Sequence, residues 1–138
     1  MLVSLNTYSQ KIGEIVDGKL VITEDLSFLK VKWNKILVES NLEGEIDRFE
    51  ISAGEYLDDD LKTVTYYQIT GFTKDNYTKI AGELTVNSES LSLSNANTCT
   101  CSGCMYGCHP KKIKKIGWAC EPACGGMSEC TKSESASD

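Results

Sequence analysis

Apolar and polar residues alternate with a period of two over much of residues 1–94. The alternation is clear at Leu29, Val31 and Trp33, at 80–86 and at 91–93. A period of two places one face of a β-strand against a core and the other face in water, so we predict strands at these places. About six to eight strands at roughly ten-residue spacing indicate a small antiparallel sandwich or barrel, and the predicted fold class is mainly β.

Turn and strand signals within this region differ in strength. Asp17-Gly18 stands between apolar residues and predicts a two-residue hairpin, because both residues can adopt positive φ in a type I′ turn. Residues 62–70 are rich in β-branched and aromatic side chains and predict a strand. Residues 45–51 fit either a strand or a short helix. The acidic run at 58–60 lacks the spacing of an EF-hand, so we interpret it as a solvated loop between strands.

The cysteines are confined to the C-terminal part of the chain. All seven, together with the only histidine, lie between Cys99 and Cys130. A segment this small and glycine-rich cannot bury a sufficient core, so crosslinks must hold it. We therefore predict a β-rich domain at 1–94, a polar linker at 95–98, a compact cysteine-rich crosslinked module at 99–130 and a disordered tail at 131–138.

Charge and composition exclude several classes of protein. Residues 1–98 carry nine Lys+Arg and sixteen Asp+Glu, whereas residues 99–138 carry five and four, so the net charge of −6 comes from the first part. An acidic body makes nucleic-acid binding an unfavoured function. No apolar run reaches the roughly twenty residues of a membrane span, and the first residues lack a signal-peptide pattern. These observations predict a cytoplasmic protein, with secretion as the alternative if an upstream signal was removed.

Zinc is the first explanation of the crosslinks. Seven cysteines and one histidine provide eight ligands, enough for two tetrahedral sites. Cys101-Ser-Gly-Cys104 is a C-x-x-C step whose glycine allows the backbone to turn both sulfurs toward one ion. One partition gives the first four cysteines to one ion, and an interleaved partition fits equally well. The predicted ligands are Cys99, Cys101, Cys104, Cys108, His109, Cys120, Cys124 and Cys130.

Disulfides without any cofactor are the alternative explanation. Three bridges would leave one of the seven cysteines over, and the fifteen pairings of any six cannot be distinguished from sequence. An iron–sulfur cluster fits less well, because the ferredoxin pattern needs a further C-x-x-C step. A redox enzyme is also unfavoured, since Cys101-x-x-Cys104 follows a polar segment and does not open a helix in a βαβ unit.

A basic stretch lies between the two groups of cysteines and supplies the candidate partner-binding residues. These are Lys111, Lys112, Lys114, Lys115 and Trp118. Lysines on a crosslinked loop can meet an acidic protein partner or another anionic surface, including the acidic body of this chain, or can simply keep the loop soluble. We predict a non-enzymatic binding or interaction protein whose module is held by structural zinc. The alternatives are a secreted, disulfide-stapled structural or adhesive module, and a ribosomal precursor peptide with a modified Cys/Ser/Thr tail.

Overall fold

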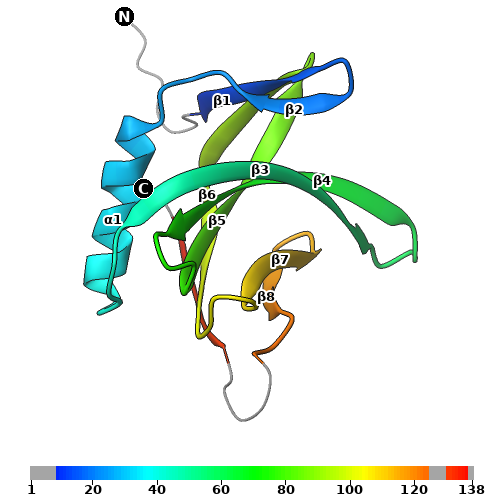
Figure 1. Cartoon of the computed structure of the whole chain (residues 1–138). Helices are drawn as coiled ribbons and strands as arrows, with labels where there is room; N and C mark the ends of the chain where they lie inside the picture. Colours follow the sequence, from blue (N-terminus) through cyan, green and yellow to red (C-terminus); the bar gives the residue numbers. More distant parts are fainter. Residues whose placement is uncertain (1–8, 125–129, 137–138) are drawn as a thin grey trace, which may run out of the picture.

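One antiparallel sheet carries most of the chain, so the prediction of a mainly β fold is confirmed (Figure 1). The computed structural model describes residues 9–124 and 130–136. Its elements are β1 (Ser9–Val16), β2 (Lys19–Ile22), α1 (Ser27–Glu39), β3 (Ile46–Leu57), β4 (Thr63–Thr73), β5 (Thr78–Asn87), β6 (Ser90–Ser102), β7 (His109–Lys114), β8 (Gly117–Glu121) and β9 (Thr131–Ala136).

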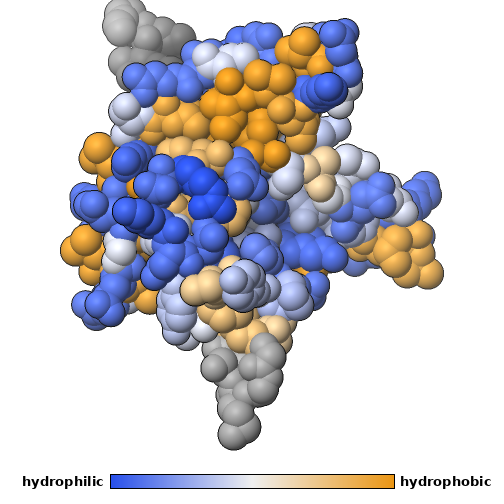
Figure 2. All heavy atoms as spheres, in the orientation of Figure 1, coloured by the Kyte–Doolittle hydropathy of each residue, from blue (hydrophilic) through white to orange (hydrophobic). Residues whose placement is uncertain are grey.

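The main sheet curves into a nearly closed barrel in the strand order β2-β1-β6-β5-β4-β3 (Figure 1). Strand β6 pairs with β1 through its first half and with β9 through its second half, from Asn97 to Ser102. The β7–β8 hairpin forms a separate two-stranded sheet. Apolar residues gather on the side of the molecule between the β1–β2 hairpin and β3, where the barrel is open, whereas the surface below β3 is mainly hydrophilic (Figure 2).

The predicted hairpin at Asp17-Gly18 is confirmed. Asp17 and Gly18 have φ values of 52° and 78° and connect β1 to β2. The register pairs Val16 with Lys19, which leaves a two-residue loop. The predicted strand at 62–70 is confirmed, since residues 63–70 lie in β4, and residues 46–51 of the ambiguous segment 45–51 lie in β3.

The strand predicted around Leu29 is wrong, because this segment is helix α1. Leu29, Trp33 and Leu37 are fully buried at a spacing of four residues, which is the spacing of one helix face. Val31, which alternation placed beside them, is 72% exposed. Helix α1 packs against the core residues of the sheet, and its Trp33 ring lies 5.8 Å from that of Phe49.

The two faces of the sheet pack against different partners. On β4, the side chains of Tyr67 and Ile69 belong to the core around α1. The alternate residues, Gln68 and Thr70, point to the opposite face and are also buried. This second face is covered by the β7–β8 hairpin and the cysteines. Buried residues on both faces explain why β4 does not show a simple apolar-polar alternation.

The predicted linker and disordered tail are both corrected by the structure. Residues 95–98 lie within β6, which continues without a break into the cysteine region. Thr131–Ala136 forms β9 on the edge of β6. Polar sequences enter strands here because ladder hydrogen bonds use the backbone and do not require apolar side chains. The rest of the predicted tail, 137–138, lies outside the described residues, as do residues 125–129 of the module.

The acidic run is a solvated turn, as predicted. It connects β3 to β4, and the side chain of Asp58 organises it. Asp58 Oδ1 accepts hydrogen bonds from the backbone N–H groups of Asp60 and Lys62, at 2.8 and 2.9 Å. Such an Asx-type arrangement explains an acidic residue at this position without a bound ion.

Candidate functional site

Three disulfides hold the segment that follows β6. The first cysteine of each pair lies at the end of β6 or in the loop before β7, and the second lies on β8 or after it. Each disulfide therefore joins the chain before β7 to β8 or to the chain after it. The pairs are Cys101–Cys120, Cys104–Cys124 and Cys108–Cys130, with S–S distances of 1.96, 2.08 and 1.97 Å.

This pairing corresponds to the disulfide alternative and not to the predicted zinc sites. A sulfur in a disulfide offers no thiolate to a metal, so six of the eight predicted ligands are occupied in the oxidised protein. The histidine is also separate from the sulfurs: His109 is exposed at the start of β7 and lines a cleft with Arg48 and Glu50. Disulfides are thus the crosslinks that this structure shows.

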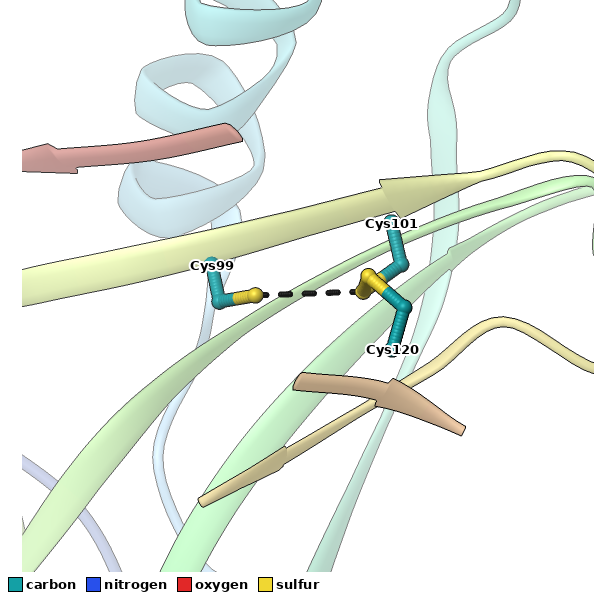
Figure 3. A group of neighbouring side chains, drawn as sticks. All are labelled: Cys99, Cys101 and Cys120. Carbon is teal, nitrogen blue, oxygen red and sulfur yellow. Dashed lines mark hydrogen bonds between the residues drawn. A yellow bond between two sulfur atoms is a disulfide. The ribbon is translucent and has the colours of Figure 1, made fainter. Parts of the chain in front are cut away.

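Cys99 is the cysteine left over by the odd count. It lies on the same face of β6 as Cys101, and its Sγ atom is 3.8 Å from that of Cys101 (Figure 3). Burial raises the pKa of the Cys99 thiol to about 12, with a smaller contribution from Glu134. The thiol is therefore protonated at neutral pH, and a protonated thiol does not attack the neighbouring disulfide.

The burial of Cys99 predicts slow alkylation in the folded protein. With a pKa of about 12, roughly one thiol in a thousand is ionised at pH 9. We expect iodoacetamide to react with Cys99 about 100-fold more slowly in native protein than in urea, both at pH 8 and at pH 9. A time course of intact mass measures this rate. Equal rates in buffer and in urea would show that Cys99 is accessible, contrary to this structure.

A buried lysine of the main sheet anchors the disulfide-held segment. The Lys79 side chain is fully buried, and its Nζ donates hydrogen bonds to the backbone oxygens of Cys104, Met105 and Gly107. Burial lowers the pKa of this ammonium group, and the positive charge of Arg48 lowers it further. Three carbonyl groups from the loop before β7 are thus satisfied by one side chain of β5.

Further contacts attach the β7–β8 hairpin to the polar face of the sheet. The backbone N–H of Lys112 donates to the hydroxyl of Tyr66 at 3.1 Å. Lys112 Nζ forms an ion pair with Glu83 at 2.9 Å and lies 5.3 Å from the centre of the Trp118 ring. A second apolar cluster lies beneath these contacts and contains Ala81, Cys99, Cys101, Cys108, Trp118 and Cys124. The hairpin and the sheet are consequently packed as one unit.

The candidate partner-binding residues separate into two groups. Lys112 and Trp118 are each 3% exposed, so these two residues hold the hairpin to the sheet and are not available to a partner. Lys111, Lys114 and Lys115 are exposed, and Lys111 lies 3.8 Å from Glu121. The acidic body is thus the partner of Lys112, one of the possibilities that the sequence left open.

Sequence reasoning missed the residues that attach the module. Lys79 and Tyr66 stand in ordinary strand patterns, and nothing in those patterns shows that their polar atoms reach the cysteine loop. Gln68 and Thr70 alternate with apolar residues of β4, a pattern that normally indicates a face in water, and their burial becomes visible only in the structure.

Comparison of the chain with protein-family models, with curated proteins and with solved structures finds no match in any of the three.

Proposed function

We propose that this protein is a non-enzymatic binding module of an oxidising compartment, which uses the tip of its β7–β8 hairpin to contact an acidic protein partner. Three disulfides support the compartment, because such bridges persist outside the reducing cytosol. They favour the secreted alternative over the predicted cytoplasmic location. Within the described residues, no helix has the length and apolar character needed to cross a membrane.

The observation that carries this proposal is the contrast between the base and the tip of the hairpin. The base is fixed by the disulfides and by Lys112. The tip, formed by Lys114, Lys115 and Ile116, is exposed, and Ile116 is 76% exposed. A rigid base reduces the conformational entropy that binding would otherwise cost. Two cations beside an apolar side chain suit a partner with carboxylates around an apolar spot.

A neighbouring cleft supports a protein partner in particular. A volume of about 490 Å³ lies between the hairpin tip and the β3–β4 turn. Leu57, which is 57% exposed, stands on the opposite side of this cleft together with Asp58 and Asp59. An apolar centre flanked by charged residues has the composition of a protein-binding surface.

The proposal is tested by charge reversal at the tip. The probe is immobilised poly-L-glutamate in 50 mM NaCl, which presents carboxylates as an acidic protein surface does. Lys114→Glu with Lys115→Glu is expected to weaken binding about tenfold or more. The matched control, Lys30→Glu with Lys35→Glu on α1, makes the same change of charge at two exposed lysines and should change binding by less than about twofold.

Two results would contradict this function. One is an equal loss of binding in both double variants, which would mean that net charge and not the tip is recognised. The other is binding to vesicles containing phosphatidylglycerol without binding to poly-L-glutamate, which would replace the protein partner by a lipid surface.

Structural zinc in the reduced protein is a second candidate. Two groups of three Sγ atoms support it, with the atoms of each group within 4.8 Å of one another: Cys99, Cys101 and Cys120, and Cys104, Cys108 and Cys124. Each group contains one disulfide, so its thiolates exist only after reduction. Metal analysis of reduced protein after zinc addition and gel filtration tests this candidate; retention of no zinc would remove it.

A further inference from the structure

A polar cleft lies between the main sheet and the first residues of β7, away from the hairpin tip. Its volume is about 380 Å³, which is within the range of small-molecule sites. His109 and Pro110 form the wall on the β7 side. The other wall consists of alternate residues of β3 and β4, namely Arg48, Glu50, Ser52, Gln68, Thr70 and Phe72. The disulfide-held module thus converts part of an open polar sheet face into a cleft.

Gln68 lines the cleft and has a side-chain oxygen with no hydrogen-bond partner in the described part of the chain. The residue is 7% exposed, and its Nε2 donates to Thr70 Oγ1 at 2.9 Å and to the Pro110 backbone oxygen at 3.1 Å. Because a backbone oxygen can only accept, the amide nitrogen must face Pro110, and this fixes the orientation of the amide. Its Oε1 then has no hydrogen-bond partner among the described residues. A buried acceptor of this kind is normally satisfied by water or by a ligand donor.

Arg48 supplies an oriented cation to the same cleft. Its guanidinium lies 4.2 Å from the centre of the Phe72 ring. Nη1 donates to Asn76 Oδ1 at 2.6 Å, and Nε donates to Glu50 Oε2 at 3.3 Å. These bonds use two of the five N–H groups of a guanidinium, so donors remain for an anion. An arginine held by stacking and by hydrogen bonds loses little side-chain entropy when it binds a carboxylate.

The cleft contains charges of both signs, because Glu50 lines it and forms an ion pair with Arg48 at 3.3 Å. The Lys79 ammonium lies on the adjacent strand β5, and its hydrogen bonds go to backbone oxygens and not to a carboxylate. Burial lowers the pKa of His109, Lys79 lowers it further, and Glu50 acts in the opposite direction. A bound anion would add its negative charge to that of Glu50 and so raise the pKa of His109.

We propose that this cleft binds a small carboxylate that also carries O–H or N–H donors. The carboxylate pairs with Arg48 and faces His109, and a donor of the same molecule satisfies Gln68 Oε1. Hydroxylated acids and amino acids share this chemistry. Six of the eight lining residues are polar or charged, and the ring of Phe72 is covered by Arg48, which disfavours a purely apolar ligand.

The single histidine of the chain makes the test direct, because one imidazole resonance reports the site. The proton NMR signal of His109 is followed across pH with and without D-glucuronate, and separately with L-glutamate. Saturable binding with an upward shift of the His109 pKa is expected for at least one of the two. Glucuronate alone would assign hydroxylated acids, and glutamate alone would assign amino acids. D-glucose lacks the carboxylate and acetate lacks the additional donors, so both should bind at least tenfold more weakly.

Variants separate the cleft from general electrostatics. Arg48→Gln should weaken binding at least tenfold. Lys111→Gln removes the same charge from an exposed position outside the cleft and should leave the binding affinity unchanged. Ser52→Phe fills the cleft from an exposed strand position and should also abolish binding if Arg48→Gln disturbs the fold. The proposal is overturned if neither acid binds saturably, if acetate binds as tightly as both acids, or if Arg48→Gln and Lys111→Gln behave alike.

Discussion

Replacing Cys101 and Cys120 together by alanine is expected to lower the free energy of unfolding by about 3 kcal/mol. The bridge joins residues separated by 19 positions, and opening a loop of that length increases the conformational entropy of the unfolded chain by about this amount. Cys101 is fully buried in the second apolar cluster, so its sulfur also contributes packing. Urea denaturation of the double variant and of the unaltered protein measures the difference.

Cys99→Ala is the matched control for this pair. It removes a sulfur from the same cluster, 3.8 Å from Cys101, but it opens no crosslink. We expect a loss of about 1 kcal/mol from the smaller buried volume. A loss as large as that of the double variant would mean that packing, and not the crosslink, accounts for the stability of the module.

Lys79→Met is expected to destabilise the protein by about 2 kcal/mol. Methionine has a similar length and retains the apolar part of the side chain, but it leaves the backbone oxygens of Cys104, Met105 and Gly107 without their common donor. Removing the buried ammonium also removes its desolvation cost, which offsets part of the loss. Chemical denaturation measures the change. The rate of amide hydrogen exchange should increase most in the loop before β7.

Lys19→Met is the control for this substitution, because Lys19 is exposed on β2 and the change should stay within about 0.5 kcal/mol. If Lys79→Met were as stable as the unaltered protein, the contact between β5 and the cysteine loop would not be a major attachment of the module.

The sequence predicted the elements whose signals are local. A type I′ turn requires positive φ at both central positions, and Asp17-Gly18 is one of the few residue pairs that adopt it readily. Residues 63–70 lie in β4 because β-branched and aromatic side chains fit a pleated sheet that is covered on both faces. The acidic run at 58–60 was correctly interpreted as a solvated loop. The Asp58 carboxylate accepts hydrogen bonds from backbone N–H groups of its own turn, so the run needs no bound ion.

Other elements could not be assigned from local pattern. Leu29 and Trp33 are four residues apart, a spacing that suits both a strand face and a helix face. The apolar Val31 between them favoured a strand, and that prediction was wrong. Strand β9 has no apolar pattern, and it exists because the edge of β6 is available to pair with it. That edge is a property of the tertiary structure.

The candidate site was predicted in composition but not in arrangement. The sequence identified the cysteines and the possibility of three bridges with one thiol remaining, but the pairing depends on which sulfurs the fold brings together. Lys112 and Trp118 were candidates for partner binding because clusters of this kind are often exposed. Their burial results from Glu83 and Tyr66, which lie far away in the sequence.

The most direct test of this account is the intact mass of natively purified protein after alkylation in denaturant without reductant, with metal analysis of the same sample. The structure predicts one alkyl group per chain at Cys99, six cysteines that react only after reduction, and no requirement for zinc. Alkylation of all seven cysteines without reduction, accompanied by about two zinc ions per chain, would contradict the disulfide-held module and establish the eight-ligand zinc hypothesis in its place.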